Sequence, residues 1–263
     1  MVDERDAGLS RVLVTRPVGE ASDTLCAAIK AAGYEVYSQP LLELNALPQL
    51  PAAQRQLVLH LDSYQHVIFI SANAVRFGMA LVNDYWPQLP TGLNWYAIGA
   101  ATAAVLARHG IAAITPERVM SSEGLLAVPA LQHVREQRVL IVKGEGGRAT
   151  LTAELSRRGA AVDELACYRR SLPELPAGEL AAKFSRWGID VIMLSSGEGL
   201  ANLQVLLSPA ETSKLKHIGL IVPSARVAHL AREAGFEQIV TAENASDGAM
   251  LRALRTWQPG NGV

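Results

Sequence analysis

HVIFISANAVRFGMAL, at His66–Leu81, contains a change of pattern from which the fold of this chain can be predicted. Val67–Ile70 is a short run of β-branched and aromatic residues, long enough for a buried strand. The run ends at Ser71, a residue type that commonly caps helices, and helix-forming residues with apolar side chains at helical spacing continue from Ala72. The segment therefore predicts a strand, a tight turn and a helix.

The same pattern returns in the second half of the chain as DVIMLSSGEGLANLQVL, at Asp190–Leu206. Other segments return in the same order and at a nearly constant spacing, which is far longer than the period of a solenoid repeat. The pairs are RVLVTRP (11–17) with RVLIVKG (138–144), WYAIGAATAAVLARHG (95–110) with IGLIVPSARVAHLAREAG (218–235), and SSEGLL (121–126) with SDGAML (246–251). We interpret this as the duplication of a unit built as βαβ followed by βαβαβα.

The composition is typical of a globular protein with one large or two modest domains. The 263 residues are 49% hydrophobic and 19% charged, which is ample for buried cores. A net charge of −1 indicates no basic surface for nucleic acid. Cys26 and Cys167 are too few for a disulfide framework or a zinc cluster. We interpret Cys167 as a small buried residue rather than a reactive thiol.

The amino-terminal residues MVDERDAG are charged and lack the apolar core of a signal peptide. The apolar runs are all shorter than the roughly 18–20 residues that span a membrane. We therefore expect a soluble, cytoplasmic protein.

Strands that alternate with helices predict parallel sheets covered by helices on both faces. The extended run Glu35–Leu44 contains Pro40, which suits an edge strand or a crossing between sheets. A further strand is expected at Ala112–Thr115. In sheets of this class, the ligand binds at the carboxyl ends of the strands and in the turns that follow them.

The turns that the repeat preserves are small, polar and poor in titratable groups. Helix amino termini in such turns bind carboxylate or phosphate through backbone N–H groups. One base stands at the matching strand end of each unit, Arg16 and Lys143, and each can be either a ligand contact or a solvated charge. We predict a donor-rich site for a polyanion, built from Ser71, Ala72, Asn73, Gly99, Thr102, Ser121, Ser122, Ser195, Ser196, Pro223, Ser224 and Ser246.

Other kinds of site are weakly supported. The spacing of histidine, cysteine and carboxylate residues does not predict a metal centre. Ser71 and Ser195 lack the GxSxG pattern and an evident histidine partner, so a helix cap is favoured over a nucleophile. Gly144–Arg148 faintly resembles a phosphate-binding loop, but without the Walker pattern a flexible turn into the next helix is favoured.

The motifs VLVTRP, FISANAV, AIGAATAAVLARHG, SSEGLL, RVLIVKGEGGR, ACYRRS and VPSARVAHLAREAGF together resemble the bacterial uroporphyrinogen-III synthases. Each motif is short and loose, but their order and spacing are specific, and they extend from Arg11 to about Leu254. The chain departs from the family at one turn, where Val222 replaces a glycine and Val227 stands near the usual threonine. Hydroxyl contacts at that turn are therefore in doubt.

The resemblance implies two flavodoxin-like α/β domains joined by a two-stranded linker, with the active site in the cleft between them. Carried onto this sequence, the first domain combines residues 1–36 and 173–263, and the second is 43–163. The linker strands are then 37–42 and 164–172. This division agrees with the repeat, because each domain takes its first βα segment from the opposite unit. It also places Tyr168 in the linker, facing the cleft, where composition alone favours a half-buried packing residue.

The resemblance further implies an enzyme that closes hydroxymethylbilane to uroporphyrinogen III, with loss of water and inversion of ring D, in heme, siroheme and cobalamin biosynthesis. It implies a hydro-lyase that uses neither a metal nor an organic cofactor. Tyr168 is the expected general acid, since a free phenol stays protonated at neutral pH. Thr15, Arg16, Lys143 and Gly144 join the turn residues as expected substrate-binding groups.

The expected partners are few. Hydroxymethylbilane is the substrate, the enzyme preceding this one in the pathway is a transient contact, and we expect a monomer that binds neither nucleic acid nor membrane. The alternative hypothesis is a hinged two-domain binding protein for a small polyanionic ligand, which the repeat and the serine-capped turns fit equally.

Overall fold

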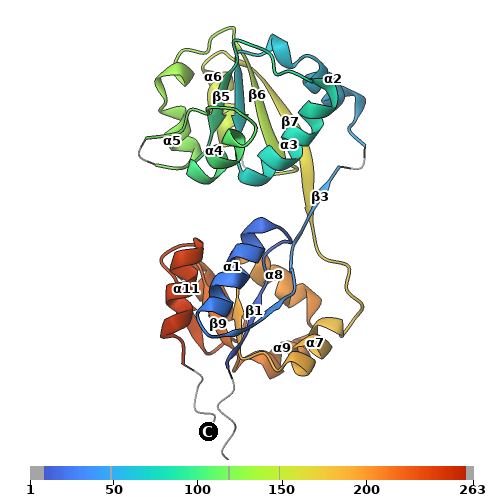
Figure 1. The fold of residues 1–263 in the computed structure, drawn as a ribbon, viewed down its shortest axis with the longest axis vertical. Coiled ribbons are helices and arrows are strands. Elements are labelled where there is room, and N and C mark those ends of the chain that lie inside the picture. The colour runs from blue at the N-terminus through green and yellow to red at the C-terminus, as the bar shows by residue number, and fades with distance from the viewer. Residues whose placement is uncertain (1–8, 48, 118, 148, 259–263) are drawn as a thin grey trace, which may run out of the picture. The chain divides into compact units, whose positions relative to one another are not determined.

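The computed structural model describes residues 9–47, 49–117, 119–147 and 149–258. The first eight residues, Arg148 of the glycine-rich segment and the carboxyl-terminal residues 259–263 lie outside them. The chain forms two compact units (Figure 1), one running to Glu43 and again from Ser171, the other spanning Leu44–Arg170. Each unit contains a five-stranded sheet flanked by helices. The predicted class, α/β with two domains, is confirmed.

The sheet of the first domain has the strand order β10-β9-β8-β1-β2, and its neighbouring strands pair in parallel. Helices α7, α8 and α10 cover one face through Leu180, Leu200 and Val227. Helices α1 and α11 cover the other face through Leu25 and Met250. The elements are β1 (Arg11–Val14), α1 (Glu20–Ala31), β2 (Glu35–Ser38), α7 (Glu179–Trp187), β8 (Val191–Met193), α8 (Gly197–Leu206), α9 (Pro209–Leu215), β9 (Gly219–Val222), α10 (Ala225–Glu233), β10 (Ile239–Thr241) and α11 (Asp247–Thr256).

The sheet of the second domain has the order β3-β7-β6-β4-β5, with β7, β6, β4 and β5 paired in parallel. Val58 of α2, Val75 of α3 and Leu106 of α4 pack on one face. Leu125 of α5 and Leu151 of α6 pack on the other. The elements are β3 (Glu43–Ala46), α2 (Ala52–Leu59), η1 (Leu61–Ser63), β4 (His66–Phe69), α3 (Ala72–Tyr85), β5 (Asn94–Ala97), α4 (Ala100–Ala107), α5 (Ser122–Leu126), η2 (Pro129–Leu131), β6 (Arg138–Gly144), α6 (Thr150–Arg157) and β7 (Ala161–Ser171).

Four strands of one sheet correspond to four of the other once the repeat is taken into account: β9, β8, β1 and β2 match β5, β4, β6 and β7. The first domain joins β1 and β2 of the first repeat to β8, β9 and β10 of the second. The second domain joins β6 and β7 of the second repeat to β4 and β5 of the first. In each sheet the chain runs outward in both directions from one central pair, β1 with β8 or β6 with β4, and such a point is where α/β sheets bind ligands.

The organising segment forms the predicted strand, turn and helix. All residues of β4 are buried, as expected of a central parallel strand. Gly78 lets α3 approach the sheet closely, because a Cβ atom there would lie 2.5 Å from Val142 Cγ1 and 3.2 Å from the Phe69 ring. The core of this domain therefore depends on a small residue in the middle of α3.

One predicted strand is wrong, and one helix was missed. The strand expected at Ala112–Thr115 is reduced to a single bridge between Ile114 and Tyr96, since Pro116 follows and cannot donate to a ladder. Helix α9 was not predicted at all. Its capping box, in which the Ser208 side chain and the Glu211 side chain each accept from the other's backbone N–H, was visible in the sequence as Ser-Pro-Ala-Glu.

The expected linker segments contain sheet residues. Tyr37 and Ser38 pair with β1, so the first sheet extends into the segment 37–42, and Pro40 follows the edge strand β2. In the segment 164–172, residues as far as Tyr168 pair with β6. The residue-by-residue division into two domains and a linker stays a proposal.

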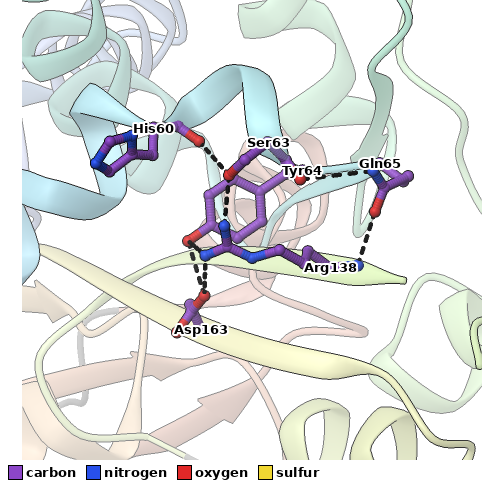
Figure 2. Close-up of polar contacts among 6 residues, drawn as sticks. All are labelled: His60, Ser63, Tyr64, Gln65, Arg138 and Asp163. Carbon is purple, nitrogen blue, oxygen red and sulfur yellow. Dashed lines mark hydrogen bonds and ion pairs between the residues drawn. The ribbon is translucent and has the colours of Figure 1, made fainter. Parts of the chain in front are cut away.

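A compact polar cluster around Arg138 lies at the end of the second sheet where β4 and β6 begin (Figure 2). The guanidinium donates to Ser63 Oγ at 2.6 Å and to Asp163 Oδ2 at 3.0 Å, and it lies 4.4 Å from the centre of the Tyr64 ring. Tyr64 also donates to Asp163 at 2.8 Å, and burial followed by this hydrogen bond raises its pKa. Because β4 and β6 begin here, the cluster lies at the end of the sheet opposite the predicted site. We assign it to stability.

Among the described residues, every helix is too short or too polar to cross a membrane.

Candidate functional site

The serines at the carboxyl ends of the strands cap the helices that follow. Each Oγ accepts the backbone N–H three residues ahead, which fixes the turn and leaves other N–H groups of the first turn free of intrahelical partners. The donor–acceptor distances are 3.0 Å at Ser71, 3.2 Å at Ser121, 3.1 Å at Ser196, and 3.4 Å at both Ser224 and Ser246. The predicted capping role is confirmed for Ser71. It is wrong for Ser195, because the next residue, Ser196, is the cap of α8.

In the first domain, Arg16 ties two of these turns together, the one before α8 and the one before α11. Its Nε donates to Ser195 Oγ at 2.9 Å, and a terminal nitrogen donates to the Ala245 carbonyl at 2.8 Å. The other terminal nitrogen forms an ion pair with Asp247, the first residue of α11. The Arg16 side chain is only 12% exposed. The sequence left open whether Arg16 is a ligand contact or a solvated charge, and its burial shows that the second alternative is wrong.

Thr15 precedes Arg16 at the same strand end. Its hydroxyl is buried and donates to the Met193 carbonyl at 2.7 Å, which joins the residue after β1 to the last paired residue of β8. The central pair of the first sheet therefore ends in a buried hydroxyl, a held guanidinium and the serine-capped helix α8.

In the second domain the base at the equivalent sequence position is Lys143, and it has a different environment from that of Arg16. Lys143 is still within β6, paired with Ala166, and its side chain is 9% exposed. Its Nζ donates to Glu164 Oε2 at 2.9 Å, and the Thr152 hydroxyl donates to the other carboxylate oxygen. Burial tends to raise the pKa of Glu164, but these two hydrogen bonds outweigh burial and hold its pKa below the usual value. The expectation that Lys143 stands at a strand end is wrong.

We call the carboxyl end of the central strand pair of each sheet its corner. A β-bulge in β7 places Tyr168 at the corner of the second sheet. Lys143 pairs with Ala166 but Gly144 pairs with Tyr168, so Cys167 is an extra residue in β7. Cys167 and Tyr168 consequently both pack on the face covered by α3, where strict alternation would place them on opposite faces. The Tyr168 ring stacks on Phe77, with ring centres 5.1 Å apart. Its hydroxyl lies 3.5 Å from Ser71 Oγ.

Gly144 provides the space that the Tyr168 ring fills. A Cβ atom at Gly144 would lie 2.7 Å from Tyr168 Cζ, closer than real carbon atoms approach. The Tyr168 carbonyl in turn accepts the Glu145 N–H at 2.8 Å. Gly146 and Gly147 follow with positive φ, so the segment is a turn into α6, as favoured from the sequence; Arg148 is outside the described residues.

The remaining predicted residues vary in their access to solvent. Ala72 and Asn73 are half-exposed in the first turn of α3, and Gly99 and Ser122 are half-exposed at the starts of α4 and α5. Thr102 and Pro223 are buried. The Val227 side chain is in the core, but its N–H donates to Ser224, so this turn keeps a hydroxyl despite its departure from the family.

A family model described as "Uroporphyrinogen-III synthase HemD" matches residues 23–252. The chain belongs to the uroporphyrinogen-III synthase family. It is 34% identical to the uroporphyrinogen-III synthases of Salmonella typhimurium and Escherichia coli, over 93% of this chain and 99% of each relative. The family model extends through most of both repeat units.

Solved structures of the family share the fold. The uroporphyrinogen-III synthetase of Helicobacter pylori aligns with a TM-score of 0.61 at 14% identity, covering 95% of this chain and 100% of that one. A mutant uroporphyrinogen-III synthase of Thermus thermophilus aligns with a TM-score of 0.57 at 19% identity, covering 94% and 100%.

Cys167 and the other potential metal ligands were also considered as site residues. Cys167 is buried, its thiol donates to the Lys143 carbonyl at 3.2 Å, and burial raises its pKa to about 12. The interpretation of Cys167 as a small buried residue is confirmed. Among the described residues, no group of three or more histidine, cysteine, aspartate or glutamate side chains is placed to hold a metal ion.

A cavity of about 670 Å³ lies beside α5. It is lined mainly by apolar residues such as Ile114, Val119 and Val128, together with the carboxylates of Glu117 and Glu123. Its charge is unfavourable for an anionic ligand, so we place the candidate site at the serine-capped turns instead. Sequence reasoning missed Asp247 and Phe77, because the contacts that make them relevant link elements far apart in the chain.

Proposed function

We propose that this chain catalyses the closure of hydroxymethylbilane to uroporphyrinogen III. The observation that carries the proposal is the match to the uroporphyrinogen-III synthases of two bacteria over almost their entire length. The serine-capped turns at the carboxyl ends of both sheets add independent support from the structure.

The chemistry needs little from the protein except position. Hydroxymethylbilane carries eight carboxylates, and its hydroxyl leaves readily because the pyrrole nitrogen supplies electrons to form an azafulvene. Unaided, the chain closes to the uninverted isomer I. The enzyme must hold it so that ring D is attacked at its substituted carbon, giving a spiro intermediate that leads to isomer III. Positioning of this kind supplies up to roughly 7–11 kcal/mol.

We propose that the helix amino termini behind Ser71, Ser196 and Ser224 bind acetate and propionate arms of the substrate. A capped helix start presents backbone N–H groups and a positive dipole end, which bind carboxylates without a full charge. In this proposal Arg16 holds the turns of the first domain in place, because its donors are committed to Ser195, Asp247 and Ala245. Asn73 and Ser122, which are half-exposed in the first turns of α3 and α5, complete the proposed binding surface.

Tyr168 stays our candidate for the group that assists the reaction from the second domain. The phenol is 2% exposed and its hydroxyl faces the Ser71 cap, so we propose that it acts together with Ser71. We also propose that the chain works as a monomer that receives its substrate by transient contact with the preceding enzyme. The spontaneous closure of hydroxymethylbilane favours such a transfer.

The test is incubation of the purified chain with hydroxymethylbilane, followed by oxidation and chromatographic separation of the uroporphyrin isomers. We expect isomer III in large excess over the isomer I formed in an enzyme-free control. Formation of isomer I at the spontaneous rate would overturn the proposal. A binding protein, the alternative from the sequence, would retain the bilane and give no excess of isomer III.

A further inference from the structure

The Ser71 hydroxyl has more neighbours than a helix cap needs. A serine hydroxyl offers one donor and two acceptor positions. The Ala74 N–H, at 3.0 Å, occupies one acceptor position of Ser71 Oγ. The Tyr168 hydroxyl, at 3.5 Å, is a second partner, and either oxygen has the geometry to donate.

Burial decides the direction of this second hydrogen bond. Tyr168 is 2% exposed, and Ser71 Oγ is the partner of its hydroxyl within the described part of the chain. If Ser71 donated, the phenol proton would be buried without an acceptor, which is unfavourable. The phenol therefore donates, and Ser71 Oγ accepts.

Both acceptor positions of Ser71 Oγ are then filled, and its own proton is left for a third direction, away from Ala74 and Tyr168. Ser71 is half-exposed at the carboxyl end of β4, so that direction is open to a ligand. We infer that Tyr168 is a positioning residue that orients the Ser71 hydroxyl, and that Ser71 donates its proton to a carboxylate oxygen of the substrate. This inference rests on the proposed function.

The phenol is held firmly enough for this role. Its ring is fixed between Phe77 and Gly144, and the bulge at Cys167 sets the direction from which it approaches Ser71. Donors in series also polarise one another, so a hydroxyl that already accepts two hydrogen bonds is a stronger donor itself. The Ser71 proton thus becomes a directed donor at a helix amino terminus, where an anionic oxygen is already favoured.

A double-mutant cycle tests the inference through kcat/KM for isomer III formation. Loss of one hydrogen bond to a charged group corresponds to about tenfold, so we expect Ser71→Ala to lower kcat/KM about tenfold, mainly through KM. Tyr168→Phe should lower it about threefold, also through KM. The double variant should be no worse than Ser71→Ala. An effect of Tyr168→Phe that persists in the Ser71→Ala background would overturn the inference, and so would an effect confined to kcat.

Matched variants separate orientation from helix capping. Ser71→Gly has neither a hydroxyl nor any other side-chain donor, but glycine is well tolerated at the start of a helix, so this variant should resemble Ser71→Ala in KM while retaining more stability. Ser71→Thr keeps both functions and should recover most of the activity. Ser196 caps α8 in the same way, at 3.1 Å from the Gly199 N–H, but lies in the other domain. Ser196→Ala and Tyr168→Phe should therefore be multiplicative in kcat/KM.

Failure of the proposed function is distinct, because the wild-type protein would then form no excess of isomer III.

Discussion

The corners of the two sheets come from the same repeated segment, but their side chains differ in chemistry. In the first domain the corner holds a cation, Arg16, which bonds to the turns before α8 and α11. In the second domain the equivalent Lys143 is buried against Glu164, and a neutral phenol from the neighbouring strand stands at the corner. A duplication can therefore preserve strand order and helix caps while the side chains at the ligand-binding edge diverge.

Strand length explains the difference. β1 ends at Val14, so Arg16 is already in the turn and its side chain reaches the loops beyond. β6 continues to Gly144, which keeps Lys143 within the sheet on the face covered by α6. The longer β6 also permits the bulge in β7, and the bulge delivers Tyr168.

The largest effect is expected when the cation of the first domain is removed. Arg16→Met should lower kcat/KM by about 10–100-fold, because charged hydrogen bonds worth about 1.5–3 kcal/mol each hold the turns around Ser195 and Ala245. Steady-state kinetics with hydroxymethylbilane measures the change. Arg16→Lys keeps the charge but loses the fork geometry, and should recover only part of the loss. Full recovery by lysine would show that charge alone matters at this corner.

The next largest effect is expected from filling the space beneath the phenol of the second domain. Gly144→Ala should displace the Tyr168 ring and lower kcat/KM by about tenfold, with a loss of about 1–3 kcal/mol in unfolding free energy. Denaturant unfolding and kinetics should be measured on the same samples. Wild-type activity in Gly144→Ala would contradict the proposal that the position of the Tyr168 ring over Gly144 matters for activity.

A smaller effect is expected from the phenol oxygen alone. Tyr168→Phe should slow the formation of uroporphyrinogen III about threefold and leave isomer III as the product, since one lost hydrogen bond is worth about 0.5–1.5 kcal/mol. Isomer analysis accompanies the kinetics. A switch to isomer I would mean that the hydroxyl determines how the bilane is folded. An unchanged rate would leave Tyr168 as a packing residue.

The smallest effect on activity is expected at the base of the second domain. Lys143→Met should change kcat/KM less than twofold, because the amine is committed to Glu164. It should lower stability by about 1 kcal/mol at neutral pH, since Glu164 is partly exposed and stays hydrated. A large rise in KM would show that Lys143 binds substrate, and the comparison between the two corners would then fail.

The same variant has a predicted pH dependence. The pKa of Glu164 is lowered in the folded state, so its stabilisation is complete above the unfolded pKa of about 4.3 and is lost as pH falls through the lower folded value. Without Lys143 part of this lowering disappears. The stability difference between the wild type and Lys143→Met should therefore shrink below about pH 4, as followed by denaturant unfolding at a series of pH values.

Much of the fold followed from local patterns. The strand, turn and helix around Ser71 were predicted because burial, capping and helical periodicity all agree within a few residues. The strand at Ala112–Thr115 failed because the β-branched run was given more weight than Pro116, which follows it and limits its pairing to a single bridge. At the site, the helix caps were predictable from residue type. The direction of Lys143 and the bulge at Cys167 were not, because both depend on where a strand ends and on its neighbour's register.

The exchange of βα segments between the repeats has a consequence for synthesis on the ribosome. The second domain comprises one continuous stretch and is complete once Arg170 has been made. The first domain is not, because Arg11, the first residue of β1, donates its backbone N–H to Asp190 beside β8, 179 residues later in the chain. The nascent β1 must wait for its central partner while the whole second domain emerges. Contacts this distant in sequence slow folding, so the amino-terminal segment is the part of the nascent chain most dependent on protection from aggregation.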